Sequence, residues 1–217
     1  MTDVVGLGAG GHAKVVLDIL RLESRWNVVG LLDPNPELRG ASVDGVEVLG
    51  GDSLLSDLLG RGIHHAFVGV GSAGDLRPRQ GLYELARSAG LVVVDAIHPS
   101  AVVASSARIG PGVTLAARAI VNPGAVLGEN VLVNTGAIVE HDCTIGDHAH
   151  IATSAALGGG VEVGDGSHVG IGASVRQEIR IGRGSIVGAG AVVIDDVPDG
   201  VIVAGVPASL LRIMDRT

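Results

Sequence analysis

The chain has 217 residues, which is long enough to bury a substantial core, but its composition is unusual. Hydrophobic residues make up 47% of it, yet Phe, Trp and Tyr occur once each, while glycine occurs 35 times. Small and branched aliphatic side chains must therefore fill the core. The net charge is −8, with 15 Lys and Arg against 23 Asp and Glu, and no basic run indicates nucleic-acid binding.

No segment predicts export or membrane insertion. The N-terminus, MTDVVGLGAGG, has an acidic residue where a signal peptide has a basic region, and no apolar run is long enough to cross a bilayer. The single cysteine, Cys143, has no partner for an internal disulfide. We therefore expect a cytoplasmic protein with neither membrane nor nucleic-acid partners.

The first part of the chain alternates between strand-like and helix-like segments. In chain order, apolar runs and helical periodicities predict strand, helix, strand, helix, strand, helix and strand at residues 3–7, 12–22, 28–33, 53–59, 65–71, 81–90 and 91–95. Such alternation is typical of a parallel α/β sheet. We assign an α/β domain to residues 1–96.

From residue 97 the pattern changes to a period of six. Seventeen consecutive positions six residues apart, from Ile97 to Val193, hold Ile, Leu or Val, and a small or aliphatic residue follows each of them four positions later. This period predicts a parallel β-helix with three faces in each coil of eighteen residues. Both sets of residues would point into a narrow interior that excludes aromatics. We assign this β-helix, with a C-terminal cap, to residues 97–217.

The segment VNTGAIVEHDCTIGDHAHI, residues 133–151, gathers titratable side chains on the predicted coils. His141 follows the inward Val139 by two residues, so we expect it on the outside near a turn. Pro123 and Gly159 hold the equivalent positions one coil earlier and one coil later. Because Gly159 has no side chain, it leaves room beside His141 and exposes backbone N–H groups. Acyl transfer requires such a base with donors for a developing oxyanion.

Two carboxylates flank His141 in the sequence, from Glu140 and Asp142. A neighbouring carboxylate favours the imidazolium and orients the ring, as a general base requires. We therefore predict that His141 is a catalytic residue. The alternative is a non-catalytic scaffold, in which replacing His141 by alanine would change nothing.

A zinc site is the other alternative. His141, His148, His150 and His168 supply enough imidazoles for an enzyme like the γ-class carbonic anhydrases, and His168 stacks one coil after His150. Cys143, however, falls in the inward set, where it replaces alanine as a small core residue. We expect no metal and keep the zinc enzyme as a distant alternative.

A glycine-rich motif marks a second candidate site near the N-terminus. The segment GLGAGG at residues 6–11 matches G-x-G-x-x-G between a strand and a helix, and Asp33 closes the second strand. A dinucleotide fold needs two halves, so a domain of this length suits one nucleotide. Gly8, Gly10 and Gly11 would cradle a diphosphate at the helix N-terminus, and Asp33 would accept hydrogen bonds from a ribose or base.

Residues at the end of the third strand lie on the same predicted edge of the sheet. Gly69, Gly71 and Ser72 are therefore second-rank candidates for ligand binding. The alternative is that the glycines serve only the tight turn and that this domain binds nothing.

Five motifs together carry a family resemblance: GAGGHAK at 8–14, LLD at 31–33, HPSA at 98–101, NTGAIVEHD at 134–142 and GVPA at 205–208. The chain resembles the NeuD-like sugar O-/N-acyltransferases, a hexapeptide-repeat family that includes the bacillosamine-pathway and perosamine N-acetyltransferases. The resemblance covers essentially the whole chain. It implies a left-handed β-helix and a homotrimer that binds acetyl-CoA between neighbouring β-helices.

The resemblance also implies roles for individual residues. His141 would be the base that deprotonates the acceptor, with its ring held by Asp142, where the bacillosamine enzyme has Glu, or by Glu140. The remaining implied site residues are Asn134, His150 near the acetyl group, Gly159 with its N–H at the thioester oxygen, Gly205 and Pro207 near the CoA nucleotide, and His12 toward the sugar or phosphate.

These implications define one reaction and its rivals. We expect an acetyl-CoA-dependent N-acetyltransferase that acts on a nucleotide-linked amino sugar, at a 4-amino group, by direct transfer without an acyl-enzyme. The alternative is O-acetylation of a sugar such as sialic acid, since His141 would serve either acceptor.

Overall fold

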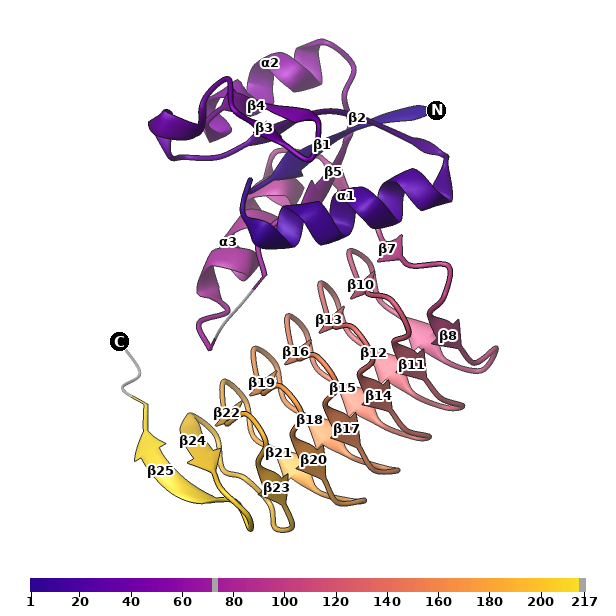
Figure 1. Ribbon diagram of the computed structural model, residues 1–217, viewed down its shortest axis with the longest axis vertical. Coiled ribbons are helices and arrows are strands. Elements are labelled where there is room, and N and C mark those ends of the chain that lie inside the picture. The colour runs from indigo at the N-terminus through magenta and orange to yellow at the C-terminus, as the bar shows by residue number, and fades with distance from the viewer. Residues whose placement is uncertain (72–73, 215–217) are drawn as a thin grey trace. The chain divides into compact units, whose positions relative to one another are not determined.

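The computed structural model of the protein describes residues 1–71 and 74–214 (Figure 1). The chain forms two compact units, one of Met1–Ala73 with Arg77–Pro99 and the other of Gly74–Leu76 with Ser100–Thr217. The functional division at residues 96 and 97 stays a prediction.

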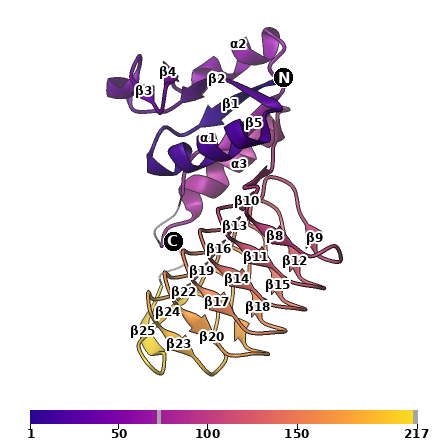
Figure 2. The ribbon, with the colours of Figure 1, turned by 45° about the vertical axis from the view of Figure 1, so that its right-hand side comes forward.

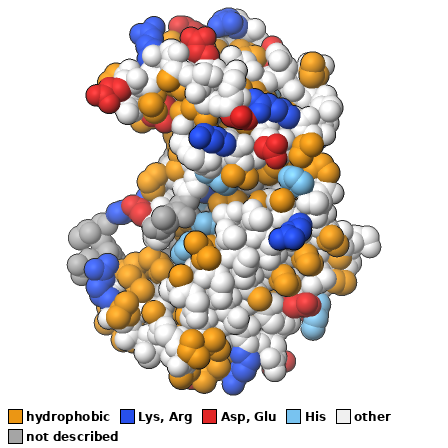
Figure 3. All heavy atoms as spheres, viewed as in Figure 1, with side chains coloured by type: hydrophobic (Ala, Val, Ile, Leu, Met, Phe, Trp, Pro, Cys, Tyr) orange, Lys and Arg blue, Asp and Glu red, His pale blue; other side chains and the backbone are white. Residues whose placement is uncertain are grey.

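In the described part of the chain, no helix combines the length and apolarity that a bilayer crossing demands. On the face seen in Figure 3, Lys and Arg side chains are scattered rather than gathered into one patch.

The first unit is built on a six-stranded sheet with the order β3-β4-β2-β1-β5-β6. Its strands are parallel except for the antiparallel pair β3 and β4, which confirms the predicted parallel α/β sheet. The strand bounds are β1 Thr2–Leu7, β2 Trp26–Leu32, β3 Ser42–Val43, β4 Val46–Gly50, β5 His65–Val68 and β6 Val92–Val93.

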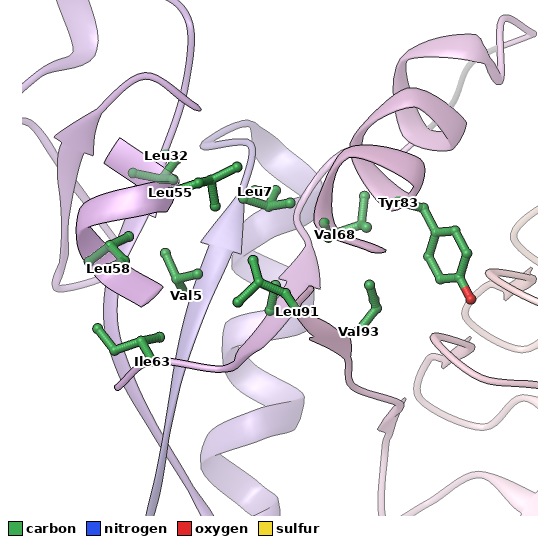
Figure 4. Packing of buried hydrophobic residues seen from close by; sticks show 12 residues of the cluster. Val5, Leu7, Leu32, Leu55, Leu58, Ile63, Val68, Tyr83, Leu91 and Val93 are labelled. Atoms are coloured by element: carbon green, nitrogen blue, oxygen red, sulfur yellow. The ribbon is translucent and has the colours of Figure 1, made fainter. Parts of the chain in front are cut away.

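Helices cover both faces of this sheet: α1 (Gly11–Glu23) on one face, and α2 (Leu55–Gly60) with α3 (Arg77–Ser88) on the other. Alternate β1 residues serve the two cores, since Val4 packs with α1 while Val5 packs with α2 and α3. Figure 4 shows the second of these cores. Two 3₁₀ turns, Pro36–Leu38 and Asp52–Leu54, and the short strand β7 (Ala96–Ile97) complete the elements.

Three details of this unit differ from the sequence predictions. The hairpin of β3 and β4 was not predicted, although its turn residues, Asp44 and Gly45, have φ of 48° and 79° and form the Asp-Gly pair that favours such turns. Helix α3 begins at Arg77 instead of residue 81, because a proline at its second position is tolerated in a first helical turn. The predicted last strand is shortened to Val92–Val93.

The second unit is a parallel β-helix, visible as a staircase of coils in Figure 2. Each coil contributes one two-residue strand to each of three sheets, and strands eighteen residues apart pair in parallel, as predicted. The sixteen strands after β7 run β8 Val102–Val103, β9 Arg108–Ile109, β10 Thr114–Leu115, β11 Ile120–Val121, β12 Val126–Leu127, β13 Leu132–Val133, β14 Ile138–Val139, β15 Thr144–Ile145, β16 His150–Ile151, β17 Ala156–Leu157, β18 Glu162–Val163, β19 His168–Val169, β20 Ser174–Val175, β21 Arg180–Ile181, β22 Ile186–Val187 and β23 Val192–Val193.

The two predicted inward sets fill the interior of the coils. The sixfold aliphatics are buried from Leu115 to Val193, whereas Val103 in the first coil is 37% exposed, because a terminal coil has a neighbour on one side only. Cys143 is buried in the small-residue set, where its Sγ donates to the Gly158 carbonyl at 3.2 Å. The prediction that Cys143 is a core residue is thus confirmed.

A hairpin closes the C-terminal end of the β-helix. Strand β24 (Val201–Ala204) pairs in parallel with β22, and β25 (Ser209–Ile213) pairs with β24 in the antiparallel direction. The turn between them contains a cis peptide bond before Pro207.

Candidate active site

His141 lies in the turn that follows β14, and its ring is held by the next residue. Its Nδ1 lies 2.9 Å from Oδ2 of Asp142, while its backbone N–H donates to Oε2 of Glu140 at 3.1 Å. Because the Nδ1–H of the neutral ring donates a hydrogen bond to the Asp142 carboxylate, Nε2 is the basic nitrogen. The hydrogen bond that the ring donates to Asp142 is the largest effect on the pKa of His141 and raises it; desolvation opposes this rise, and the charges of Asp142 and Glu140 add to it, so the pKa lies above its ordinary value.

The basic nitrogen of His141 lies directly over the backbone of Gly159, one coil later. A Cβ on Gly159 would be 2.5 Å from Nε2 of His141, so only glycine fits there without moving the imidazole. The carbonyl of His141 accepts from the N–H of Gly160 at 2.9 Å, and that of Gly159 accepts from the N–H of Glu178 at 2.9 Å. No partner of the Gly159 N–H lies within residues 1–71 and 74–214. A base and an available N–H donor therefore lie side by side.

Asn134 and His150 form a second group, on the sheet that contains β13 and β16. The backbone N–H of Thr135 donates to Oδ1 of Asn134 at 2.8 Å, which turns the amide nitrogen toward Nε2 of His150 at 3.3 Å. Since the amide nitrogen donates, Nε2 of His150 accepts and Nδ1 carries the proton. His150 is only 4% exposed.

The ring of His168 stacks against that of His150, with centroids 4.8 Å apart and an interplanar angle of 62°. The two residues are ladder partners in β16 and β19, as the eighteen-residue coil predicted. Burial lowers the pKa of His168. Both rings are thus held on one face of the β-helix.

The two groups occupy different parts of the coil. His141 follows β14, His150 opens β16, and β15 (Thr144–Ile145), which belongs to a third sheet, lies between them. The structure thus brings Glu140, Asp142 and Gly159 to His141, but it leaves Asn134 and His150 a full face away on the same chain.

The glycine loop of the first unit shows close packing on one side and open space on the other. Gly8 has φ of +98°, and a Cβ on Gly69 would be 2.5 Å from the Gly8 carbonyl oxygen, so these backbones touch. In contrast, a Cβ on Gly10 or Gly11 would meet nothing within 4 Å. The first turn of α1, which Gly10 precedes, has no side-chain cap among the described residues. This open space adjoins the N-terminus of α1, where backbone N–H groups favour an anion.

Asp33 braces this loop. Its Oδ2 accepts from the N–H of Ala9 at 2.9 Å and its Oδ1 from the N–H of Asn35 at 3.0 Å. Each oxygen keeps a second lone pair, so the predicted contact with a nucleotide stays a prediction.

His12 and Gly71 lie together at the same edge of the sheet, since a Cβ on Gly71 would be 3.2 Å from Cβ of His12. Burial, and then the charge of Arg79, lowers the pKa of His12 to about 3. Sequence reasoning missed Arg79, because nothing in a helical arginine distinguishes a buried position from an exposed one. Ser72 lies outside the described residues.

Gly205 and Pro207 belong to the exposed turn between β24 and β25. Gly205 has φ of +99°, and its carbonyl accepts from the N–H of Val192 at 3.0 Å.

In the described part of the chain, no group of three or more His, Cys, Asp or Glu residues is arranged to hold a metal ion.

Fold and site together define a hexapeptide-repeat acyltransferase. Residues 3–84 match the PglD N-terminal domain, and residues 124–159 match the bacterial transferase hexapeptide model of six repeats. No curated protein sequence matches the chain.

Solved structures identify the family. A variant of perosamine N-acetyltransferase from Caulobacter crescentus, in which one histidine is replaced by asparagine, was solved in complex with CoA and GDP-perosamine. It is 42% identical to this chain over 98% of both chains, with a TM-score of 0.92. The acetyltransferase domain of PglB from Neisseria gonorrhoeae, in complex with acetyl coenzyme A, is 39% identical over 96% of this chain and 98% of that chain, with a TM-score of 0.89. WeeI from Acinetobacter baumannii is 26% identical over 97% of this chain and 100% of that chain, with a TM-score of 0.77.

The chain belongs to the NeuD-like family of sugar acyltransferases, and it is an acetyltransferase. Its β-helix is the left-handed one that the resemblance implied. These matches favour acetyl transfer over the carbonic anhydrase alternative.

Proposed function

We propose that the protein transfers the acetyl group of acetyl-CoA to the amino group of a nucleotide-linked amino sugar. The observation that carries this proposal is the pairing of the basic Nε2 of His141 with the backbone of Gly159. The Caulobacter relative, which is an N-acetyltransferase, was solved with CoA and GDP-perosamine, and the PglB domain was solved with acetyl-CoA. These ligands support both substrate classes.

The reaction follows from the site as a direct transfer. Nε2 of His141 takes a proton from the acceptor amine as its nitrogen attacks the thioester carbon. The N–H of Gly159 donates to the oxyanion that develops on the former carbonyl oxygen. The C–S bond then breaks, the thiolate takes the proton from His141, and the products are the N-acetyl sugar and CoA.

Asp142 is the residue that we assign to orient the base. Its carboxylate contacts the ring of His141 at 2.9 Å, whereas Glu140 contacts the backbone N–H. A single methylene separates aspartate from the glutamate of the bacillosamine enzyme, and in this chain the shorter side chain still reaches Nδ1.

The α/β unit serves as the nucleotide site in this proposal. Gly8, Gly10 and Gly11 present backbone to a diphosphate, while Asp33 supplies acceptor oxygens. His12, with Gly71 against it, faces the sugar or phosphate.

A homotrimer in the cytoplasm completes the proposal. His141 and His150 lie on opposite sides of one face of a coil, so a single chain does not bring them to one acetyl group. A threefold arrangement of β-helices would place His150 and Asn134 of one copy beside His141 of the next. Acetyl-CoA would lie in that interface, with its nucleotide end toward Gly205 and Pro207.

O-acetylation is the remaining alternative. Nε2 of His141 can take the proton of either a hydroxyl or an amine as that group attacks the thioester, so the geometry of the base does not distinguish the acceptors. The N-acetyltransferase activity of the Caulobacter relative favours the amine.

The test is CoA thiol release from acetyl-CoA with a panel of GDP-, UDP- and dTDP-linked 4-amino sugars and free sialic acid. We expect release with an amino sugar, and a loss of about 10²–10⁴-fold in kcat/KM for His141→Ala at unchanged thermal stability. Release with sialic acid alone would move the protein to the O-acetyl branch. Equal rates for wild type and His141→Ala would contradict the role of the base.

A further inference from the structure

Arg79 is an arginine buried in the α/β unit, with 1% of its surface exposed. It lies in the first turn of α3, and its Nη1 donates to the carbonyl oxygen of Val70 at 3.0 Å. Burial lowers its pKa to about 10. Because a buried cation costs several kcal/mol of desolvation, its position calls for a specific role.

The backbone that Arg79 holds leads directly to His12. Val70 precedes Gly71, and a Cβ on Gly71 would be 3.2 Å from Cβ and 3.3 Å from Cγ of His12. One residue before Val70, the N–H of Gly69 donates to the Leu7 carbonyl at 2.7 Å. The segment after β5 is thus held by β1 on one side and by Arg79 on the other, with the imidazole of His12 packed against it.

Nε2 of His12 is buried and has no hydrogen-bond partner among the described residues. A buried polar atom without a partner indicates a ligand or water that completes it. Among the described residues, Arg79 is the charged group that acts on the pKa of His12, and burial together with this charge keeps the ring neutral above about pH 3. A neutral ring keeps one nitrogen as a donor and the other as an acceptor.

We propose that Arg79 is a positioning residue of the nucleotide-sugar site: it holds the Val70–Gly71 backbone against His12 and so fixes where Nε2 of His12 meets the substrate. The inference rests on the proposed function of the α/β unit. Arg79 itself is covered and does not touch the substrate. It acts through His12 and through the backbone that it anchors.

The kinetic test compares Arg79→Met and Arg79→Lys with Arg87→Met, a matched control on the exposed side of α3. With GDP-perosamine as acceptor, we expect Arg79→Met to raise the KM of the nucleotide sugar about tenfold, equivalent to about 1.4 kcal/mol, and to leave the KM of acetyl-CoA within about twofold. Arg79→Lys keeps the charge and one donor and should recover part of the loss. An unchanged KM, or equal rises for both substrates, would overturn the inference.

A second measurement does not depend on activity. The pKa of His12, measured by NMR with ¹³C-labelled histidine, should rise in Arg79→Met because the repelling charge is removed, and should stay unchanged in Arg87→Met. A merely structural arginine would lower the melting temperature without moving this pKa relative to the control. If the wild type acetylates no amino sugar while the pKa of His12 still rises in Arg79→Met, the proposed function fails and the electrostatic effect of Arg79 on His12 stands. An unchanged pKa in Arg79→Met would overturn the inference whatever the activity.

Discussion

The two units of this chain differ in how sequence position determines spatial position. In the β-helix, residues eighteen apart are stacked, so Gly159 lies beside His141 and His168 beside His150. In the α/β unit, neighbours are set by the packing of separate elements. His12 meets Gly71 and is influenced by Arg79, although these residues lie in three different segments.

Neighbouring residues in a periodic fold can therefore be predicted from their spacing in the sequence, whereas those in a layered fold cannot. A coil repeats one local rule, so that a site is found by counting. A sheet brings together loops whose meeting depends on helix lengths and crossings. Four substitutions test this contrast, with effects that decrease from one to the next.

The largest effect is expected for Gly159→Ala, which disrupts the stacking of His141 on the glycine one coil later. A Cβ there would be 2.5 Å from Nε2 of His141, so the imidazole must move away from its N–H donor. We expect kcat to fall about 10²–10³-fold, as for the loss of an oxyanion donor. The measurement is steady-state thiol release, with Gly81→Ala as control, because a Cβ on Gly81 meets nothing within 4 Å. Activity within twofold of wild type would show that Gly159 has no role in catalysis.

The corresponding substitution in the layered unit is Gly8→Ala. Its φ of +98° disfavours a side chain, and the new Cβ would be 2.4 Å from Cγ2 of Val70. We expect a stability loss of about 1–3 kcal/mol and a rise of the nucleotide-sugar KM of about tenfold, because the loop shifts. Urea unfolding and kinetics measure the two effects. If stability falls while the KM of the nucleotide sugar does not change, the loop serves only the fold.

A smaller effect is expected for Asp142→Asn, which leaves the stack intact and removes the charge. The hydrogen bond and charge of Asp142 raise the pKa of His141, and the base works only when neutral. In wild type, activity is lost as the pH falls through this raised pKa. The variant should therefore keep its activity to lower pH, while its rate at the plateau falls about tenfold, since the base is weaker and less oriented. A pH profile of kcat/KM measures both. If the fall in kcat/KM at low pH occurs at the same pH in the variant and the wild type, Glu140 and not Asp142 orients the ring of His141.

The smallest effect is expected for Cys143→Ala. The thiol is buried, its pKa is raised by burial, and it points into the coil beside the Gly158 carbonyl. Direct transfer needs no thiol, so kcat should stay within about twofold, while the small cavity costs about 1 kcal/mol of stability. Rapid-quench analysis with radiolabelled acetyl-CoA checks for a covalent intermediate. Acetyl-enzyme that appears in wild type and disappears in the variant would replace direct transfer by a two-step mechanism.

The order of elements and the register of the coils could be predicted from the types and spacing of residues along the chain. The spacing of Val121, Val139 and Leu157 gives the stack of one face, and the motif at residues 6–11 locates the turn before α1. The hairpin at Asp44 and Gly45 was predictable in principle but was missed, because its strands are too short for a clear alternation.

The spacing of residues along the chain was enough to predict a parallel α/β unit followed by a β-helix of eighteen-residue coils, with His141 next to a glycine. It could do so because the period of six is a local property that repeats without long-range information. Three contacts became known from the three-dimensional structure alone: Asp142 holds the ring of His141, Asp33 accepts a hydrogen bond from the glycine loop, and Arg79 is buried where its charge acts on His12. Those contacts depend on rotamers and on the packing of distant elements, which no spacing along the chain encodes.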